Sequence, residues 1–456
     1  MSRIPSKVLH SSVSRFLNWP SPSELKTSVA LLARLIRTNI LQSKLCSSAD
    51  GSIALPWNAL LSALSRNGFP SISLRVLSFM HRHCIPLDSY SWCSSLAAAA
   101  ALLPPDSANL GGKIHAYVSK SGETASIFVG GALIGFYVRT DRIQDAHNVF
   151  DDIPARNIVC LNALLNGYVG KKLWMEGLSL FRTIHKLTME PDCVTISAVL
   201  KICAEVSAIG LGKECHARLV RNAGGMEKDS FLLSSLVEMY GKLGLAGNAR
   251  LVFDTWKQGT EKGGIDVVLW TSLLNSYGRN GQFDDVILTF EEMILHGTKP
   301  DEILMLVVLS ACARSGNVIK GLFFFESMMN VYGLVPTREH YSCVVDMLCR
   351  AGELEKAWNF VNQMALEDDG KGGTLFDVSA WGAILSACSA SGEVKVGKVA
   401  FERAMEMYPD NIGIHMELSK LYARVGMWDD HTELRKLMWT KGMKKDAGCS
   451  RLEIVN

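Results

Sequence analysis

The sequence contains neither a long apolar run nor a paired cysteine motif. Its longest apolar run, LAAAAALL at residues 96–103, is too short to cross a bilayer and ends in Pro104-Pro105. Its 12 cysteines include no C-x-x-C pair and show no clustering of the kind that disulfide frameworks have. These absences predict no transmembrane span and no membrane insertion. They also favour reduced cysteines that pack in a core.

A strong excess of basic charge is also absent. The formal net charge is +2, and residues 1–53 carry seven Lys/Arg against two acidic residues, which leaves 40 basic and 43 acidic residues in the remainder. A general basic surface for nucleic acid is therefore excluded, and any RNA binding must depend on the chemistry of a local groove. The 48% of apolar residues and 20% of charged residues nevertheless predict a folded chain.

Motifs that would indicate catalysis are incomplete. A zinc deaminase needs H-x-E followed by P-C-x-x-C, so that His and two thiolates hold the metal while Glu moves protons. Two H-x-E triplets occur, at 415–417 and 431–433, but Cys449 is the only cysteine after them. The GLGK stretch at 210–213 lacks the spacing of a phosphate-binding loop. We therefore predict no catalytic site, no metal site and no cofactor.

The N-terminal stretch MSRIPSKVLHSSVSRFLNWPS is rich in Ser, Arg and Lys and has no acidic residue before Glu24. This composition is typical of an organellar transit peptide, which we place at 1–38, with a variable lead-in at 39–53. The alternative is a disordered basic terminus. Arg3 and Arg15 lie in the Ser-rich part and favour the mitochondrion, with the chloroplast as the alternative.

Internal repetition is the strongest positive signal in the sequence. The same opening pattern recurs at Ala54, Ile158, Val267 and Val378, with spacings of 104, 109 and 111 residues. Each of the first three intervals divides into three units of unequal length, and the leading unit always has 35 residues. The nine predicted units are 54–88, 89–126, 127–157, 158–192, 193–229, 230–266, 267–301, 302–337 and 338–377.

Each leading unit carries two apolar stripes separated by a turn. Its positions 4, 7, 8 and 11 are apolar, which is the spacing of an amphipathic helix, and a second stripe follows a turn such as RNG. A Pro near the end of the unit blocks further helix. We therefore predict an all-α fold, a right-handed α-solenoid superhelix of stacked helix-turn-helix hairpins. The first stripe comprises Trp57, Leu60, Leu61 and Leu64; Leu161, Leu164, Leu165 and Tyr168; and Trp270, Leu273, Leu274 and Tyr277.

The ordered units resemble the plant pentatricopeptide repeat family, in its PLS subclass of alternating unit lengths. The long unit VLKICAEVSAIGLGKECHARLV (199–220) and the short unit FVGGALIGFYVRTDRIQDAHNVFDDIPARN (128–157) are typical of that subclass. Residues 378–456, with SAWGAILSACSASGEVKVGKVA (379–400), resemble its C-terminal E extension without a DYW deaminase domain. The resemblance implies single-stranded organellar RNA as the partner, and a DYW-type deaminase or other editing factor that is recruited in trans.

The resemblance also implies which residues select bases. A helical wheel places position 5 beyond the core stripe, on a face shared with positions 2, 9 and 12. In the family, position 5 and the last residue of a unit select one base, and position 2 packs between bases. The candidate pairs are Asn58 with Asp88 and Asn162 with Asp192 for U, Thr271 with Asp301 for G, and Ser234 with Asp266 and Ser342 with Asp377 for a weaker G preference. The candidate stacking residues are Leu55, Val159 and Val268.

Three functions remain open at this point. The first is an RNA-binding factor that specifies a C-to-U editing site. The second is a factor of the same family for splicing, stability or translation of organellar RNA. The third is a protein-binding scaffold similar to tetratricopeptide repeats, since Trp270, Leu273 and Tyr277 resemble part of that signature. Leu274, however, occupies the signature's glycine position.

Overall fold

The computed structural model describes residues 54–154, 156–184, 189–221, 230–259, 266–367 and 376–443. The predicted transit peptide at 1–38 and lead-in at 39–53 lie outside these residues, as does the end of the predicted E extension. The described part consists of α-helices, one 3-10 helix and connecting turns, with no strand among these residues. The predicted all-α solenoid of helical hairpins is therefore confirmed.

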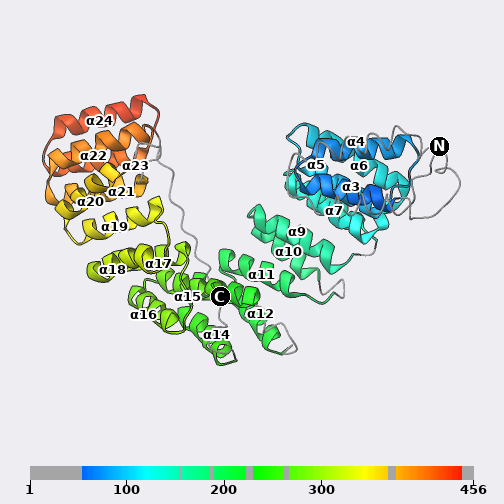
Figure 1. Ribbon diagram of the computed structural model, residues 1–456, viewed down its shortest axis with the longest axis horizontal. Helices are drawn as coiled ribbons and strands as arrows, with labels where there is room; N and C mark the ends of the chain where they lie inside the picture. The colour runs from blue at the N-terminus through cyan, green and yellow to red at the C-terminus, as the bar shows by residue number, and fades with distance from the viewer. Residues whose placement is uncertain are drawn as a thin grey trace, which may run out of the picture. The chain divides into compact units, whose positions relative to one another are not determined.

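The chain divides into two compact parts, residues 1–202 and 203–456, and the boundary falls inside helix α11. The described residues of the N-terminal part form hairpins that follow one another along the chain (Figure 1). Its helices are α3 (Leu55–Arg66), α4 (Pro70–Arg82), α5 (Ser89–Ala100), α6 (Asp106–Ser121), the 3-10 helix η2 (Glu123–Ala125), α7 (Ile127–Arg139), α8 (Ile143–Asp152), α9 (Ile158–Gly170), α10 (Trp174–Arg182) and the first residues of α11 (Cys193–Val206).

The C-terminal part continues the same hairpin pattern, and its last hairpins stack in chain order from α17 to α24 (Figure 1). Its helices after α11 are α12 (Ile209–Arg221), α13 (Ser230–Lys242), α14 (Ala246–Gly259), α15 (Val267–Arg279), α16 (Phe283–Leu295), α17 (Glu302–Ser315), α18 (Val318–Asn330), α19 (Arg338–Arg350), α20 (Leu354–Glu367), α21 (Val378–Ser391), α22 (Val394–Met407), α23 (Ile412–Arg424) and α24 (Trp428–Thr440).

The two predicted apolar stripes form the core of the hairpins. Every residue of the first stripe is at most 8% exposed, from Trp57 in α3 to Tyr277 in α15. The second stripe packs against it from the second helix of each hairpin, and Met80 and Met293 are fully buried there. Burying a large apolar side chain contributes roughly 1.5–3 kcal/mol, so this repeated stripe is the main source of stability.

The last residue of a unit begins the helix that opens the next one. Asp88, Asp301 and Asp377 cap α5, α17 and α21, and each carboxylate accepts a hydrogen bond from a backbone N–H of the first turn. Such a cap stabilises a helix by about 1 kcal/mol because it satisfies an otherwise unpaired donor. The aspartates at the unit ends therefore have a structural role whether or not they also contact a ligand.

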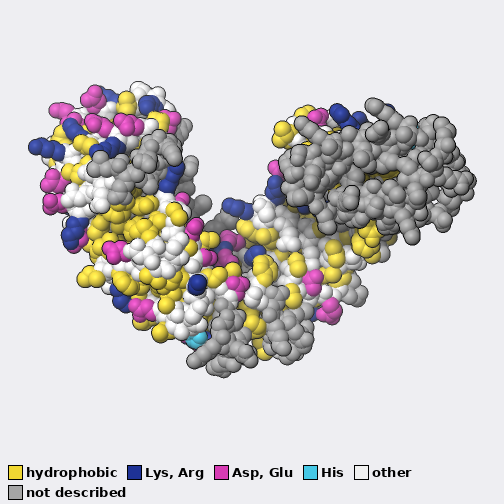
Figure 2. All heavy atoms as spheres, in the orientation of Figure 1, with side chains coloured by type: hydrophobic (Ala, Val, Ile, Leu, Met, Phe, Trp, Pro, Cys, Tyr) yellow, Lys and Arg dark blue, Asp and Glu magenta, His cyan; other side chains and the backbone are white. Residues whose placement is uncertain are grey.

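Charged side chains of both signs are distributed over the surface. Over α19 to α24, Lys/Arg and Asp/Glu side chains are interspersed on the face shown in Figure 2. This agrees with the low net charge and with the exclusion of a single basic surface. Among the described helices, none is both long enough and apolar enough to span a membrane.

Candidate functional site

The structure joins Asn58 and Asp88 in one hydrogen-bonded cluster. Asn58 lies at position 5 of its unit, and its Nδ2 donates to both Asp88 carboxylate oxygens, at 2.9 and 2.8 Å. The hydroxyl of Ser91, the third residue of the next first helix, lies 2.6 Å from Asn58 Oδ1 and 3.0 Å from Asp88 Oδ1. The cluster therefore crosses the boundary between two hairpins and fixes the orientation of the Asn58 amide.

The same cluster recurs around Asn162. Its Nδ2 donates to the Asp192 carboxylate oxygens at 2.9 and 3.0 Å. Thr195, again the third residue of the next first helix, donates its hydroxyl to Asn162 Oδ1 at 2.6 Å and contacts Asp192 Oδ1 at 2.8 Å. An amide carries two N–H donors and two acceptor lone pairs. The two oxygens of one carboxylate can share a single N–H, which leaves the second N–H and one lone pair of Oδ1 for a ligand. This remaining pair matches the O4 and N3–H of uracil.

The environment of Asp192 stabilises its charged form. Partial burial acts to raise the pKa of the carboxyl, but hydrogen bonds from the Thr195 backbone N–H, the Asn162 amide and the Thr195 hydroxyl outweigh it, so the pKa is lowered overall. The carboxylate thus stays ionised and keeps accepting from Asn162.

Asp192→Asn is expected to destabilise the protein at pH 7 and to do so less at low pH. Asn caps a helix as well as Asp does, so this change mainly removes the charge. A carboxyl whose pKa is lowered by folding stabilises the fold above its unfolded value of about 3.9, and that contribution is lost as the pH falls through the folded value. Urea unfolding at pH 7 and pH 3 measures the difference between the two proteins.

The control for this comparison is Glu190→Gln, an exposed acidic residue two positions away. Its midpoint should match that of the unaltered chain at both pH values, because an exposed carboxylate gains little from folding. A deficit of Asp192→Asn that persists unchanged at pH 3 would contradict the account.

The remaining candidate pairs are held differently. Thr271 donates its hydroxyl to the Val267 carbonyl of its own helix at 2.8 Å, and Asp301 accepts from the Leu304 backbone N–H at 2.8 Å. The third residue of this following helix is Leu304, which has no hydroxyl to contribute. The candidate pair for G therefore lacks the three-residue cluster that holds Asn58 and Asn162.

The two serine pairs also differ from the asparagine clusters. Ser234 donates to the Ser230 carbonyl at 2.8 Å, whereas the Asp266 carboxylate accepts from the Val268 backbone N–H at 3.3 Å. Ser342 instead accepts a hydrogen bond from the backbone N–H of Asp377 at 3.3 Å. Ser342 and Asp377 are thus joined by a direct hydrogen bond, unlike Ser234 and Asp266. This bond uses the backbone N–H of Asp377 and not its carboxylate.

Position 5 is more buried than the wheel of one helix indicates. Asn162 is 8% exposed, Ser234 7% and Ser342 3%. The wheel treats a helix alone, but the first helix of the following hairpin lies beside it and covers this side, as the contact between Asn162 and Thr195 shows. Position 5 is therefore at an interface between hairpins, with a narrow edge exposed.

Position 2, by contrast, is strongly exposed in hairpin after hairpin. The predicted stacking residues Val159 and Val268 are 61% and 52% exposed, whereas the side chain of Leu55 lies outside the described ones. The sequence reasoning missed that the same position is apolar and exposed in the other units. These additional residues, between 47% and 75% exposed, are Tyr90, Phe128, Val194, Phe231 and Ile303.

The series of exposed apolar residues at position 2 ends with Ile303 in the unit 302–337. Glu339 and Ser379, both exposed, occupy position 2 in α19 and α21. A comparison of the second residue of the predicted first helix in all units, and not in the leading units alone, would have revealed all of these exposed apolar residues. The hydroxyls of Ser91 and Thr195 were also missed, since their partners lie 33 residues away in the sequence.

The histidine and the glutamate of the first H-x-E triplet each have a structural role. His415 is 1% exposed, its Nδ1 lies 2.9 Å from the Asn411 carbonyl oxygen, and its ring contacts Phe401. Glu417 instead forms an ion pair with Lys420 at 2.6 Å. Within the described ranges, no group of three or more His, Cys, Asp or Glu is arranged to hold a metal ion.

The sequence patterns of known families match much of the chain. A pattern described as PPR repeat matches residues 56–85, 159–187, 268–298 and 305–331, and a second PPR repeat pattern matches 332–365. The pattern described as E motif matches residues 392–453, which include α22, α23 and α24.

Individual proteins are similar over most of this chain. The chloroplastic pentatricopeptide repeat-containing protein At1g15510 of Arabidopsis thaliana is 30% identical over 411 residues, which are 90% of this chain and 45% of that protein. The mitochondrial pentatricopeptide repeat-containing protein At3g53360 of the same plant is 31% identical over 399 residues, or 87% and 50%. The crystal structure of the pentatricopeptide repeat protein PPR10 from maize has a TM-score of 0.52 at 18% identity, and covers 92% of this chain and 67% of that one.

Fold and repeats together define a class, the all-α repeat solenoids built from helical hairpins. Within this class, the chain belongs to the pentatricopeptide repeat family and carries the E motif of its PLS type. The chain spans about half the length of the curated relatives it matches.

Proposed function

We propose that this protein binds single-stranded organellar RNA with sequence specificity and specifies a C-to-U editing site. The observation that carries this proposal is the repeated cluster of Asn, Asp and hydroxyl at Asn58 and Asn162, together with exposed apolar side chains at position 2. The clusters present one oriented amide edge per hairpin, and the apolar side chains offer surfaces against which bases stack.

The clusters and the exposed apolar residues at position 2 also indicate which units contact RNA. Apolar stacking residues are present in α5, α7, α9, α11, α13, α15 and α17, and are replaced by Glu339 and Ser379 in α19 and α21. Stacking of bases on apolar side chains is therefore proposed for the units up to 302–337. Of the proposed base contacts, U at Asn58 and Asn162 has the strongest structural support; G at Thr271 and the weaker G at Ser234 and Ser342 follow from the family resemblance.

Editing is favoured over other RNA processing because of the E motif. In the PLS type this motif is proposed to recruit a DYW-type deaminase or another editing factor in trans. The proposed organelle is the mitochondrion, with the chloroplast as the alternative, and similar proteins are named for each of the two organelles. RNA sequencing of both organelles in a plant line without the protein tests this. Loss of C-to-U conversion at one or a few sites supports editing, whereas unchanged editing with altered introns or transcript ends favours the second function.

Phe128→Ser is expected to weaken RNA binding without loss of stability. Phe128 is 75% exposed at position 2 of α7, so its removal costs little packing in the free protein. Stacking a base on an aromatic ring contributes about 1–3 kcal/mol, so we expect affinity to fall about tenfold. Electrophoretic mobility shift with RNA selected from a random pool measures the change.

Phe323→Ser is the matched control, because Phe323 is 62% exposed but lies on α18, the second helix of its hairpin. RNA affinity should be unaltered in this variant, and both proteins should melt at the same temperature. Equal RNA affinity of the two variants would show that position 2 does not stack bases. If the unaltered protein selected no RNA from the pool, a protein-binding scaffold would be favoured instead.

A further inference from the structure

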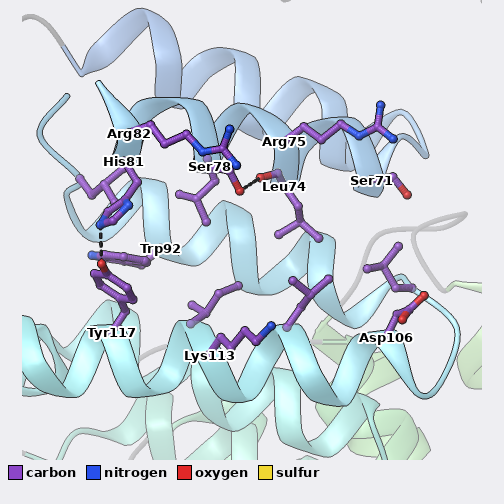
Figure 3. Close-up of a pocket in the computed structure, with 15 residues that line it drawn as sticks. Ser71, Leu74, Arg75, Ser78, His81, Arg82, Trp92, Asp106, Lys113 and Tyr117 are labelled. Atoms are coloured by element: carbon purple, nitrogen blue, oxygen red, sulfur yellow. Dashed lines mark hydrogen bonds between the residues drawn. The ribbon is translucent and has the colours of Figure 1, made fainter. Parts of the chain in front are cut away.

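A cavity of about 490 Å³ separates two second helices, α4 and α6, in the N-terminal part (Figure 3). We call it the α4–α6 trough. Its floor is apolar and buried, with Leu74, Leu77 and Ile114 each at most 9% exposed. Ser71 and Ser78 are small residues on the α4 side, one above the other two turns apart, and leave the space open. The trough has the size and apolar lining that ligand and peptide sites have.

Aromatic side chains close one end of the trough. The Tyr117 hydroxyl lies 2.5 Å from His81 Nε2, and the two rings meet edge to face at 4.7 Å (Figure 3). Trp92 from α5 stacks against Tyr117 with ring centroids 6.2 Å apart. These contacts hold the end wall in place, so the trough is a shaped feature of the two hairpins.

The walls of the trough carry three exposed cations. Arg75 and Arg82 are seven residues apart on α4, and Lys113 stands opposite on α6 (Figure 3). None of the three forms an ion pair or hydrogen bond with another residue in the described part of the chain. Asp106 at the start of α6 is the single acidic residue of the lining. The surface around the apolar floor is thus positively charged and available for an acidic partner.

The spacing of these cations indicates the form of the partner. Seven residues of α-helix extend about 10.5 Å, so Arg75 and Arg82 mark a stretch and not one point. A small amphipathic anion has one charged end and would use one of these positions. An amphipathic helix places apolar side chains at i, i+3, i+4 and i+7 into a groove and can carry acidic residues along both flanks.

We propose that the α4–α6 trough binds an acidic amphipathic helix of a partner protein. The apolar face of that helix fills the trough over Leu74, Leu77 and Ile114, and its Asp or Glu side chains pair with Arg75, Arg82 and Lys113. The floor and walls that would contact the helix lie on the second helices α4 and α6, and the end wall also includes Trp92 of α5, whereas the proposed RNA-binding residues lie on or next to first helices. The two surfaces can therefore be altered separately.

Fluorescence anisotropy with a synthetic peptide tests the proposal on the full chain. The probe is a capped helical peptide of about 18 residues, long enough to pass the whole of α4, with Leu on one face and Glu on both flanks. One control peptide has Lys in place of every Glu, and a second has Ser in place of every Leu. We expect binding of the first peptide, and at least about tenfold weaker binding of both controls.

Variants of the chain identify where the peptide binds. Arg75→Gln/Arg82→Gln/Lys113→Gln removes the charges, and Ser78→Trp fills the trough; both should weaken peptide binding about tenfold or more while RNA affinity is retained. Arg66→Gln and Lys120→Gln, which are exposed on α3 and α6 outside the trough, should bind normally. Equal binding of all three peptides, unaltered binding by both trough variants, or displacement of the peptide by RNA would overturn the proposal.

Discussion

Gly241→Ala is expected to lower the thermal unfolding midpoint of the protein by several degrees. Gly241 lies in α13, and a Cβ atom there would be 2.7 Å from Ser276 Cβ and 2.9 Å from Ser276 Cα, in α15. Carbon atoms normally pack at about 3.5–4.0 Å, and a backbone atom cannot rotate away. The two helices would have to separate. Overpacking of this kind costs about 1–3 kcal/mol.

Helix propensity opposes this effect but does not outweigh it. Ala is favoured over Gly by about 1 kcal/mol inside a helix, and by less at the penultimate residue of α13, where Gly241 lies. Gly247 in α14 is the matched control, since an added Cβ meets nothing within 4 Å there. Gly247→Ala should therefore leave the midpoint equal or slightly higher. Both variants exchange Gly for Ala within the hairpin of α13 and α14. The difference between their unfolding midpoints therefore measures the steric effect of the Cβ atom added at Gly241.

A second substitution tests the assigned contact. Ser276→Gly removes the Cβ and Oγ atoms that lie 2.7 Å from the added carbon. The Ser276 hydroxyl is buried without a hydrogen-bond partner in the described part of the chain, so its removal sacrifices no such bond. In the Gly241→Ala background, Ser276→Gly should recover part of the lost stability. Calorimetry on the unaltered chain, the two single variants and the double variant gives the coupling energy between Gly241 and Ser276. If the two substitutions changed stability additively, the strain would not arise from this contact.

Much of the fold could be predicted from sequence because its determinants are local. The stripe that contains Leu161, Leu164 and Leu165 lies within one helix, and its spacing alone indicates which side is buried. The Pro and Asp at the unit ends likewise act on the adjoining turn. Repetition then multiplies each signal, so the hairpins and their starts are evident along the chain.

The candidate site was only partly predictable because it is formed between hairpins. The pairing of Asn162 with Asp192 spans 30 residues, and was implied by family resemblance and not by any local pattern. The hydroxyl of Thr195, which fixes the amide, has no signal in its own helix. The α4–α6 trough likewise depends on how two second helices pack. Helix periodicity describes one element at a time and gives no information on such contacts.

Asn162→Ala is expected to abolish the preference for U at one position of the bound RNA. The substitution removes the amide edge, while Asp192 still caps α11 through the Thr195 backbone N–H at 2.8 Å. Folding should therefore be retained, and the loss should appear in binding. A well-formed pair of hydrogen bonds to a base contributes about 1–3 kcal/mol of discrimination, which corresponds to about fivefold to 150-fold in affinity.

Thr195→Val separates orientation of the amide from its presence. Val has nearly the shape of Thr but lacks the hydroxyl that donates to Asn162 Oδ1 at 2.6 Å. The amide then keeps its bonds to Asp192 and loses the contact that holds its oxygen in place. We expect a weaker preference for U with a smaller loss of affinity than in Asn162→Ala, and Thr195→Ser should restore both.

Selection from a randomised RNA pool measures these preferences without knowledge of the natural transcript. The unaltered protein should select RNAs with two U positions separated by two nucleotides, because Asn58 and Asn162 are in the first and fourth units. Asn162→Ala should lose the second U and keep the first, and Asn58→Ala should do the reverse. Loss of both preferences in either variant would indicate a general weakening instead of one base per hairpin. Unchanged selection in both would exclude position 5 as the site of base recognition.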